Sequence, residues 1–412
     1  MIVAVSGGSD STALLLLLKS HIDRAASATR PVAVTVDHAL REGSDREAAE
    51  VGALCARLGV AHRILTWSGA KPATGIPAAA REARHELLAK AADAEGTDLV
   101  LTGHTADDQA ETVLMRQARG GDATERRGLA GIAPATLYDG RTWFVRPLLG
   151  ERRLELRRYL SERNIGWIED PTNLDDRYER PRQRKMLSGP GGQAAIEDAL
   201  QLATTAARKR GQAGREAAML IRAHVQQAAP GLLRLSPDFF QGGERHVAIY
   251  ALRILLAVAG GAAQLPDETR TAALHDRLSA GGFKDTLAGV LADARKAGIF
   301  LMRELRDLPS RDGSAGGTTW DGRYRIVSAA HDAASRPDAA RLAPDAVPES
   351  LLRHAAATLP APDDGILAVP VVAPWARYLP SFDLPPARAV ADLLGATEIP
   401  GSPLRGHIES KA

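Results

Sequence analysis

Six residues near the start of the chain constrain its fold more than any other stretch. Positions 6–11 read Ser-Gly-Gly-Ser-Asp-Ser and separate a short apolar run, residues 2–5, from another, residues 13–18. The first run predicts a buried strand and the second predicts a helix. Gly7 and Gly8 adopt positive φ easily and leave no Cβ in the way of a ligand. The backbone N–H groups that begin the helix would then point at one anion.

Two interpretations of this loop remain open. Ser6, Ser9 and Ser11 offer hydroxyl donors to a phosphate, and Asp10 makes sense there if it holds a metal ion that the phosphates share. An ordinary helix N-cap fits the same six residues equally well. No Lys follows the glycines until Lys19, so this is not the commoner phosphate loop. The pattern resembles the pyrophosphate loop of the N-type ATP pyrophosphatases, which form adenylates.

Strand-like and helix-like stretches alternate over the first 119 residues. Strands are expected at residues 2–5, 31–36, 61–67 and 99–101, and helices at residues 13–18, 45–58, 77–94 and 107–119. This alternation predicts a doubly wound parallel sheet, in which ligands gather beyond the carboxyl ends of the strands. Ser6, Asp37 and His104 each follow a predicted strand, so we expect them at one edge of the sheet.

A second motif begins at the end of the fourth predicted strand. It reads Gly-His-Thr-Ala-Asp-Asp-Gln-Ala-Glu-Thr over residues 103–112. On a helix, Asp108 and Glu111 are three residues apart and share a face, with His104 in the preceding loop. Two carboxylates completed by phosphate and water suit Mg²⁺. An acidic first turn that is merely favoured by the helix dipole is the alternative.

Composition is that of an ordinary soluble protein. The 412 residues are 45% hydrophobic and 25% charged, which suggests two or three domains. The apolar run at residues 13–18 is too short to span a membrane, and no signal peptide precedes the first strand. The single cysteine, Cys55, excludes an internal disulfide framework and a cysteine-based metal site, and its helical Ala/Leu surroundings favour a buried core position. We expect a cytoplasmic protein.

Glycine-rich segments at residues 188–192 and 309–318 divide the chain. They predict a catalytic domain at residues 1–187, a helical middle domain at 194–308 and a small α+β C-terminal domain at 318–412. Helices are expected at 194–229 and 246–259, and a strand at 320–327. The tail beyond residue 336, rich in Pro and Ala, has no clear pattern.

Basic residues are concentrated in the middle of the chain. Residues 141–222 contain 17 Lys and Arg against 11 Asp and Glu, a balance compatible with nucleic-acid binding. For the helical run at residues 151–158, which reads Glu-Arg-Arg-Leu-Glu-Leu-Arg-Arg, a solvated face with ion pairs is the favoured interpretation.

Taken together, these motifs resemble the tRNA(Ile)-lysidine synthetase family of PP-loop enzymes. The matching segments follow the family's order over about the first 185 residues: 6–11, 36–41, 80–84, 104–112, 119–120, 128–131, 145–149 and 167–173. The resemblance implies an adenine nucleotide alpha hydrolase-like fold, with ATP and Mg²⁺ as cofactors. It also implies a reaction: free L-lysine is ligated to C2 of the wobble cytidine of a tRNA(Ile) with a CAU anticodon. That cytidine is first adenylated, and AMP and pyrophosphate are released.

The resemblance further implies residue roles. ATP would be bound by Ser6, Gly7, Gly8, Ser9, Asp10, Ser11, Asp37 and His104. Asp10 and Asp108 would hold the metal, and Asp108 and Glu111 would serve both metal and lysine. Arg84 would meet phosphate or the cytidine beside His104, whereas the tRNA or phosphate contacts would be Arg180, Arg182 and Arg184. Whether Asp108, Glu111 or Asp37 acts as the general base stays open. The C-terminal half would recognise tRNA. The sequence does not decide between a monomer and a homodimer.

Two motifs depart from the family pattern. The family's Arg-Asn-x-x-Arg is Arg-Pro-Arg-Gln-Arg here, and Pro181 removes a backbone donor and fixes φ, which leaves the geometry of that loop open. The family's Arg-x-x-Arg-Tyr ends in His85 instead of Tyr. The alternatives are a tRNA thiolase, disfavoured by the lack of paired cysteines, an amide-forming PP-loop enzyme acting on a small metabolite, and a non-catalytic nucleotide-binding or RNA-binding protein.

Overall fold

The computed structural model describes residues 1–119, 127–169, 179–310, 319–328, 347–360, 366–372 and 374–404. The chain divides into two compact units, one formed by Met1–Arg208 with Ser402–Ala412 and the other by Lys209–Gly401. The change from one unit to the other falls inside helix α8 (Gly192–His224). The division into three domains at the glycine-rich segments stays a prediction.

The first unit is built on a mostly parallel sheet. Its strands are β1 (Ile2–Ala4), β2 (Val32–Asp37), β3 (Ala61–Thr66), β4 (Leu99–Leu101), β5 (Ala135–Tyr138) and β6 (Thr142–Val145), in the spatial order β5-β6-β4-β1-β2-β3. Only β5 in this set runs antiparallel to its partner β6. The order reverses between β1 and β4, and such a switch point is where ligands bind in doubly wound sheets.

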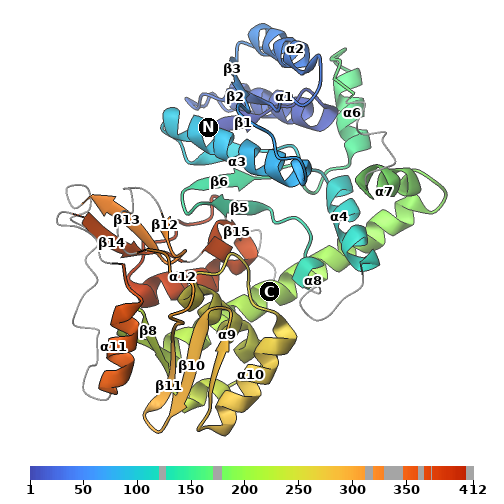
Figure 1. The fold of residues 1–412 in the computed structure, drawn as a ribbon. Coiled ribbons are helices and arrows are strands. Elements are labelled where there is room, and N and C mark those ends of the chain that lie inside the picture. Colours follow the sequence, from blue (N-terminus) through green and yellow to red (C-terminus); the bar gives the residue numbers. More distant parts are fainter. Residues whose placement is uncertain are drawn as a thin grey trace. The chain divides into compact units, whose positions relative to one another are not determined.

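Helices α1 (Ser9–Arg24), α2 (Ser44–Arg57) and α3 (Ile76–Ala94) pack on the faces of this sheet. The unit also contains α4 (Ala106–Ala118), α6 (Arg153–Ser161), which packs against α1, and α7 (Glu179–Leu187), which packs against α4. The chain moves outward from β1 to β3 and returns to β4, so right-handed connections place α1 and α2 on one face and α3 on the other. Figure 1 shows this arrangement.

The predicted doubly wound fold is confirmed. Residues Ala13, Leu14 and Leu15 of α1 are almost fully buried, as are Ile2 and Val3 of β1, which accounts for the two apolar runs around the glycine loop. The helix is longer than its apolar run, because it begins at Ser9 and continues to Arg24. Cys55 is a free, buried cysteine in α2, as expected.

The second unit contains two antiparallel sheets. Strands β7 (Val225–Ala229), β8 (Leu232–Leu235), β9 (Lys284–Leu287), β10 (Val290–Arg295) and β11 (Gly298–Arg303) form one sheet in the order β7-β8-β11-β10-β9. Strands β12 (Thr319–Trp320), β13 (Tyr324–Ser328) and β14 (Ile366–Pro370) form the other. The remaining elements are α9 (Arg245–Gly260), α10 (Glu268–Ala280), α11 (Glu349–Ala357), α12 (Leu384–Leu394), β15 (Tyr378–Pro380) and the 3-10 turns Pro237–Phe240, Pro374–Ala376 and Ser381–Asp383.

Three local predictions in this unit need correction. Residues 194–308 are not purely helical, because they contain the five-stranded sheet beside α9 and α10. The helix expected over 194–229 ends at His224, and Val225–Ala229 forms β7. The predicted strand at 320–327 is a hairpin, which turns at Asp321 (φ 49°) and Gly322 (φ 65°).

None of the helices in the described parts of the chain is long and apolar enough to cross a membrane.

Candidate active site

The glycine loop connects β1 to α1, as the apolar pattern predicts. Gly7 has a φ of +84°, in the left-handed region that favours glycine. Gly8 differs from the expectation of positive φ, because it is extended (φ −67°, ψ 161°) and forms the N-cap of α1. A Cβ built on Gly8 would meet only the Ser6 Oγ, at 3.7 Å, so its small size leaves space beside the loop.

The loop is fixed by its own hydroxyl groups. The Ser11 Oγ accepts a bond from the Ser6 N–H at 3.1 Å and donates to the Gly8 carbonyl at 3.1 Å. The Thr12 Oγ1 donates to the Gly7 carbonyl at 3.2 Å. Helix geometry leaves the first backbone N–H groups of α1 without an acceptor inside the helix. The loop can therefore offer these N–H groups, with the dipole of a 16-residue helix behind them, to a phosphate.

Two other segments pack closely against this loop. The Ile168 N–H donates to the Gly7 carbonyl at 2.9 Å, and a Cβ on Gly7 would lie 2.5 Å from the Ile168 Cδ1. A Cβ on Gly103, the first residue of the second motif, would lie 2.9 Å from the backbone of Asp10 and Ser11. Glycine at position 103 is therefore required for the two motifs to touch.

The second motif begins α4 with a capping box. The Asp108 Oδ2 accepts bonds from both the N–H and the Oγ1 of Thr105, each at 2.9 Å. One oxygen of Asp108 is thus occupied at the helix start, which is more than the dipole effect of an acidic first turn. Its other oxygen, Oδ1, faces away from the cap toward the side chains of Arg153 and Arg184.

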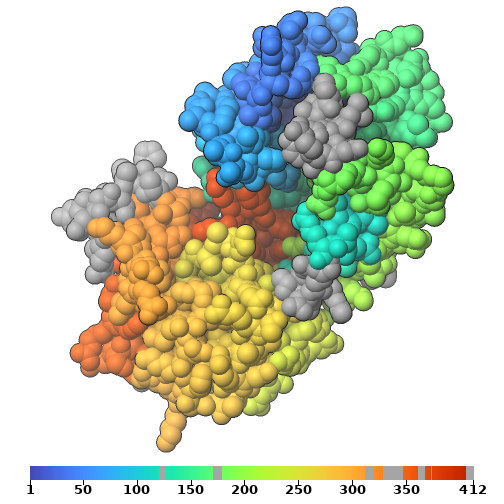
Figure 2. All heavy atoms as spheres, turned by 45° about the vertical axis from the view of Figure 1, so that its right-hand side comes forward, coloured from blue at the N-terminus to red at the C-terminus, as the bar shows by residue number. Residues whose placement is uncertain are grey.

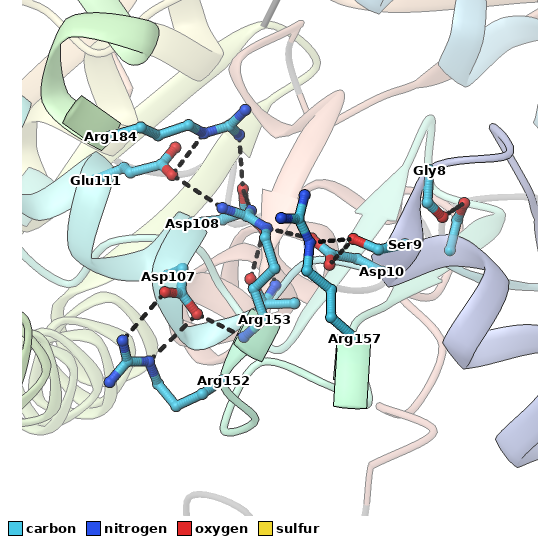
Figure 3. A network of polar contacts seen from close by, with 12 residues as sticks. Gly8, Ser9, Asp10, Asp107, Asp108, Glu111, Arg152, Arg153, Arg157 and Arg184 are labelled. Carbon is cyan, nitrogen blue, oxygen red and sulfur yellow. Dashed lines mark hydrogen bonds and ion pairs between the residues drawn. The ribbon is translucent and has the colours of Figure 1, made fainter. Parts of the chain in front are cut away.

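Asp10, Asp108 and Glu111 form a carboxylate cluster around one guanidinium (Figure 3). Arg153, at the start of α6, reaches the Asp10 Oδ2 with its Nε at 2.8 Å, the Asp108 Oδ1 with its Nη2 at 2.9 Å and the Glu111 Oε1 with its Nη1 at 3.4 Å. The Arg184 Nε donates to the same Glu111 oxygen at 2.7 Å. Arg153 therefore joins the first loop to the second motif.

Burial raises the pKa values of Asp108 and Glu111, whereas the neighbouring arginines lower them. Burial alone would raise the pKa of Asp108, but the charge of Arg153 and the Thr105 bonds outweigh it and lower that pKa. For Glu111, whose side chain is 2% exposed, burial wins and the pKa is raised despite the hydrogen bond from Arg184. Glu111 is thus the carboxyl of the pair that accepts a proton more readily, as a general base must.

The cluster fits Mg²⁺ in its chemistry but not in its present contacts. Mg²⁺ takes one or two carboxylates and completes its shell with phosphate and water, so Asp10 and Asp108 are suitable ligands. Their facing oxygens, however, both accept bonds from Arg153. Within the described ranges, no group of three or more His, Cys, Asp or Glu side chains is arranged to hold a metal ion.

The other predicted site residues lie at the ends of neighbouring strands and on α3. Asp37 ends β2 and accepts a bond from the Ala39 N–H at 2.8 Å. His104 follows β4, and its Nδ1 lies 3.1 Å from the Thr102 Oγ1. Burial, then Arg146 and Arg84, lower the pKa of His104 to about 3, so its imidazole is neutral near pH 7. Burial, and then the charge of the same Arg84, also lowers the pKa of His38, the residue that follows Asp37.

Arg146 is a buried cation behind this edge. It donates to the Ala133 carbonyl at 2.8 Å and to the Thr136 Oγ1 at 2.9 Å. Burial, together with Arg81 and Arg84, lowers its pKa to about 9. Three arginines therefore act on one another here, which makes this part of the sheet edge attractive to an anion.

The three predicted tRNA contacts lie on one helix, α7, but they differ in exposure and in what they contact. Pro181 occupies the first turn of α7, a position that tolerates proline. Arg180 and Arg182 are exposed, whereas Arg184 lies half-buried against Glu111 and Asp108. In Figure 2 the green atoms of α7 lie beside the teal atoms of α4 at the surface, in agreement with the contacts between these helices.

Arg153 is a site residue that the sequence pattern does not reveal, because its helical run favours a solvated face with ion pairs. That interpretation holds for Arg158, which pairs with Glu155 and Glu162, but Arg152 and Arg153 point toward α4. A signal was present: α6 begins with a basic residue, where the helix dipole disfavours positive charge. The same interpretation missed Arg157, which lies 3.4 Å from the Ser9 Oγ and 2.9 Å from Glu169.

Part of the family pattern falls outside the described residues. This applies to Gly120 and to residues 170–173 of the eighth matching segment. Most of the glycine-rich segment predicted as a domain boundary, residues 311–318, also lies outside the described residues.

Comparisons with known proteins agree with the motifs. Residues 1–189 match the model of the PP-loop domain family. A tRNA(Ile)-lysidine synthase from Mesorhizobium japonicum is 54% identical over 98% of this chain and 94% of its own length. Another tRNA(Ile)-lysidine synthase, from Rhizobium meliloti, is 39% identical over 98% of this chain and 93% of its own length. A solved U34-tRNA thiolase from Methanococcus maripaludis is 16% identical over 49% of this chain and 72% of its own, with a TM-score of 0.40, a likeness too low to add to the argument.

Proposed function

The chain belongs to the tRNA(Ile)-lysidine synthase family, and from this premise we propose that it ligates free L-lysine to C2 of the wobble cytidine of a tRNA(Ile) with a CAU anticodon. The observation that carries the proposal is the joining of the phosphate loop to the carboxylates of α4 through Arg153. A site that only bound a nucleotide would not need buried carboxylates from a second helix beside the loop.

In the first half-reaction, cytidine O2 attacks the α-phosphorus of ATP and pyrophosphate leaves. Negative charge grows on the phosphoryl oxygens during this step. The first N–H groups of α1 bind these oxygens, and Arg84, on α3 near His104, adds positive charge. When bound to Asp10 and Asp108, Mg²⁺ would neutralise part of the same charge.

In the second half-reaction, the lysine ε-amine attacks C2 of the adenylated cytidine and AMP leaves. The amine binds as an ammonium ion between Asp108 and Glu111 and must lose a proton before it attacks. Glu111 is the better acceptor of that proton, since burial raises its pKa whereas that of Asp108 is lowered. Glu111 is therefore our choice for the general base. Neutral His104 lines the reaction centre without adding a positive charge.

Recognition of the tRNA would involve exposed basic residues of α7 and the second unit. Arg180 and Arg182 supply positive charge at the surface next to α4, where the anticodon must reach the cluster. An enzyme with this substrate works in the cytoplasm.

The test is the incorporation of labelled lysine into a transcript of tRNA(Ile) with a CAU anticodon. We expect incorporation that requires both ATP and Mg²⁺, with one AMP formed per lysine. The matched control is the same transcript with a UAU anticodon, which lacks the target cytidine. Failure to incorporate lysine, while another amino acid or sulfide is accepted, would contradict the proposal.

A further inference from the structure

Arg153 occupies the centre of the carboxylate cluster and contacts both parts of the site. Its Nε lies 2.8 Å from Asp10 in the first turn of α1, and its Nη2 lies 2.9 Å from Asp108 on α4. Its side chain is 19% exposed, so Arg153 lies at the edge of the site and not in a closed core. Burial would lower the pKa of Arg153, but Asp108, Asp10 and Glu111 outweigh it and raise that pKa, so it stays charged.

The cluster lacks one positive charge. Three carboxylates face two guanidinium groups, those of Arg153 and Arg184. The Glu111 Oε2 is buried and has no hydrogen-bond partner among the residues that the structure describes. A buried, unpartnered carboxylate oxygen is costly unless a ligand completes it. The excess charge and the free oxygen therefore point to a cation that binds beside Glu111.

A bound triphosphate would compete for Arg153. Asp10 belongs to the first turn of α1, so phosphates held by the loop would bring several negative charges next to the Arg153 Nε. Guanidinium groups bind phosphate at least as well as carboxylate, through the same planar fork. Each bond that Arg153 gives to a phosphate is taken from one of its three carboxylates, and a shift of the guanidinium toward the loop lengthens its contacts with Asp108 and Glu111.

Building on the proposed function, we propose that Arg153 is a positioning residue that makes nucleotide binding promote amino-acid binding. In the ligand-free site its guanidinium neutralises Asp108 and Glu111. Nucleotide phosphates at the loop draw the guanidinium toward them. The ammonium ion of the substrate then takes its place at the two carboxylates, so that lysine binds after ATP and not before it.

The neighbouring Arg152 provides a matched control. It lies one residue away, at the same end of α6, and is also paired with an acidic residue of α4, Asp107, at 3.2 Å. It also donates to Gln193 at 2.7 Å, and none of its polar contacts with the described residues involves the carboxylate cluster. Substitution of Arg152 therefore removes one charge from the same helix end and leaves the contacts of Arg153 in place.

The experiment measures lysine binding without tRNA, so that no chemistry occurs. The dissociation constant of labelled lysine is determined by equilibrium dialysis with Mg²⁺ alone and with Mg²⁺ plus α,β-methylene-ATP, which cannot be cleaved at the relevant bond. In the unmodified enzyme we expect the analogue to tighten lysine binding about tenfold. In Arg153→Gln we expect tight binding without the analogue and an enhancement close to one. Arg152→Gln should behave like the unmodified enzyme.

Arg153→Lys repeats the comparison if Arg153→Gln does not fold, which circular dichroism would show. Its shorter, single-point cation should reduce the enhancement at least threefold, since it cannot span both carboxylates. The inference is overturned if Arg153→Gln keeps the full enhancement, if Arg152→Gln loses it equally, or if the unmodified enzyme shows none. Binding of another amine in place of lysine would instead contradict the proposed function.

Discussion

Each unit of the protein contains a cluster of buried carboxylates and arginines, and the two clusters are completed differently. In the second unit, Asp321 accepts bonds from Arg303 at 3.0 Å and from Arg323 at 2.8 Å. Arg303 also donates to the backbone carbonyls of Gly289 and Glu304, at 3.3 and 2.9 Å. Its guanidinium thus ties a hairpin turn to the end of β11, and protein groups alone complete the cluster.

The carboxylate cluster of the first unit has the opposite balance. Its carboxylates outnumber its arginines, and the buried Glu111 Oε2 has no partner within the described chain. The same residue types therefore stabilise the fold where their polar groups are paired within the protein. They form a binding site where one polar group has no protein partner. Completeness of the contacts, not burial or residue type, distinguishes the two.

The largest expected effect concerns the carboxylate shared by loop and cluster. Asp10→Ala should lower kcat of lysine incorporation by about 10³-fold, because the phosphates lose their metal neighbour and Arg153 loses its bond to the loop. Affinity for tRNA, measured by filter binding, should stay the same. Asp23→Ala is the control, since Asp23 lies on the same helix and its exposed side chain pairs with Lys19, away from the cluster. An unchanged rate would show that Asp10 is structural.

A paired substitution tests the comparison directly. Glu111→Gln should raise KM for lysine and lower kcat, together about 10²-fold in kcat/KM, with little change in the free energy of unfolding. Asp321→Asn should do the reverse: it leaves two buried arginines without their carboxylate and lowers the free energy of unfolding by about 3 kcal/mol. Initial rates and urea unfolding measure both. Equal loss of stability in the two variants would remove the distinction between the clusters.

A third prediction concerns a buried titratable group outside both clusters. Burial lowers the pKa of His85 from 6.5 to about 3. As the pH falls below 6.5, the unfolded chain takes up a proton that the folded chain refuses, so the free energy of unfolding decreases, by about 2 kcal/mol at pH 5. In His85→Phe the decrease between pH 7 and pH 5 should be smaller by that amount. Urea unfolding at both pH values measures it, and an unchanged difference would show that His85 is protonated in the fold.

The smallest expected effect lies on α7. Arg180→Ala combined with Arg182→Ala should weaken tRNA binding about fivefold and make it less dependent on salt, because exposed arginines act through phosphate charge. Arg184→Ala should mainly raise KM for lysine, because Arg184 contacts Glu111. Filter binding at several salt concentrations separates the two. If Arg184→Ala changes the salt dependence most, the expectation from the sequence, a tRNA contact, was the better one.

The alternating elements of the first unit could be predicted because local pattern and tertiary role agree there. The apolar residues of β1 and α1 are the buried ones, and each connection is short. Strand β7 could not be predicted in this way. Its sequence, Val-Gln-Gln-Ala-Ala, continues the Ala-rich pattern of α8, and only its pairing with β8 makes it a strand.

The site shows the same limit. Asp10, Asp108 and Glu111 were predicted as one group because the ends of parallel strands meet at one edge, although their roles stay a prediction. Arg153 was not, because its helix also carries local ion pairs such as Arg158 with Glu155. Which arginine of α6 faces solvent and which faces Asp10 depends on the packing of α6 against α1, a contact that no local pattern encodes.

The contact at Gly103 has a consequence for how this site can change. Any side chain there would act as a wedge between the phosphate loop and the start of α4, since its Cβ would lie 2.9 Å from the backbone of Ser11. The distance between the nucleotide site and the amino-acid site therefore cannot be adjusted by a substitution at Gly103, because any side chain there would disrupt the contact between the two motifs. A variant enzyme that accepts a longer or shorter amine would need substitutions elsewhere, at Arg153 or Arg184. These side chains are long, contact Glu111 and can be exchanged without moving the backbone.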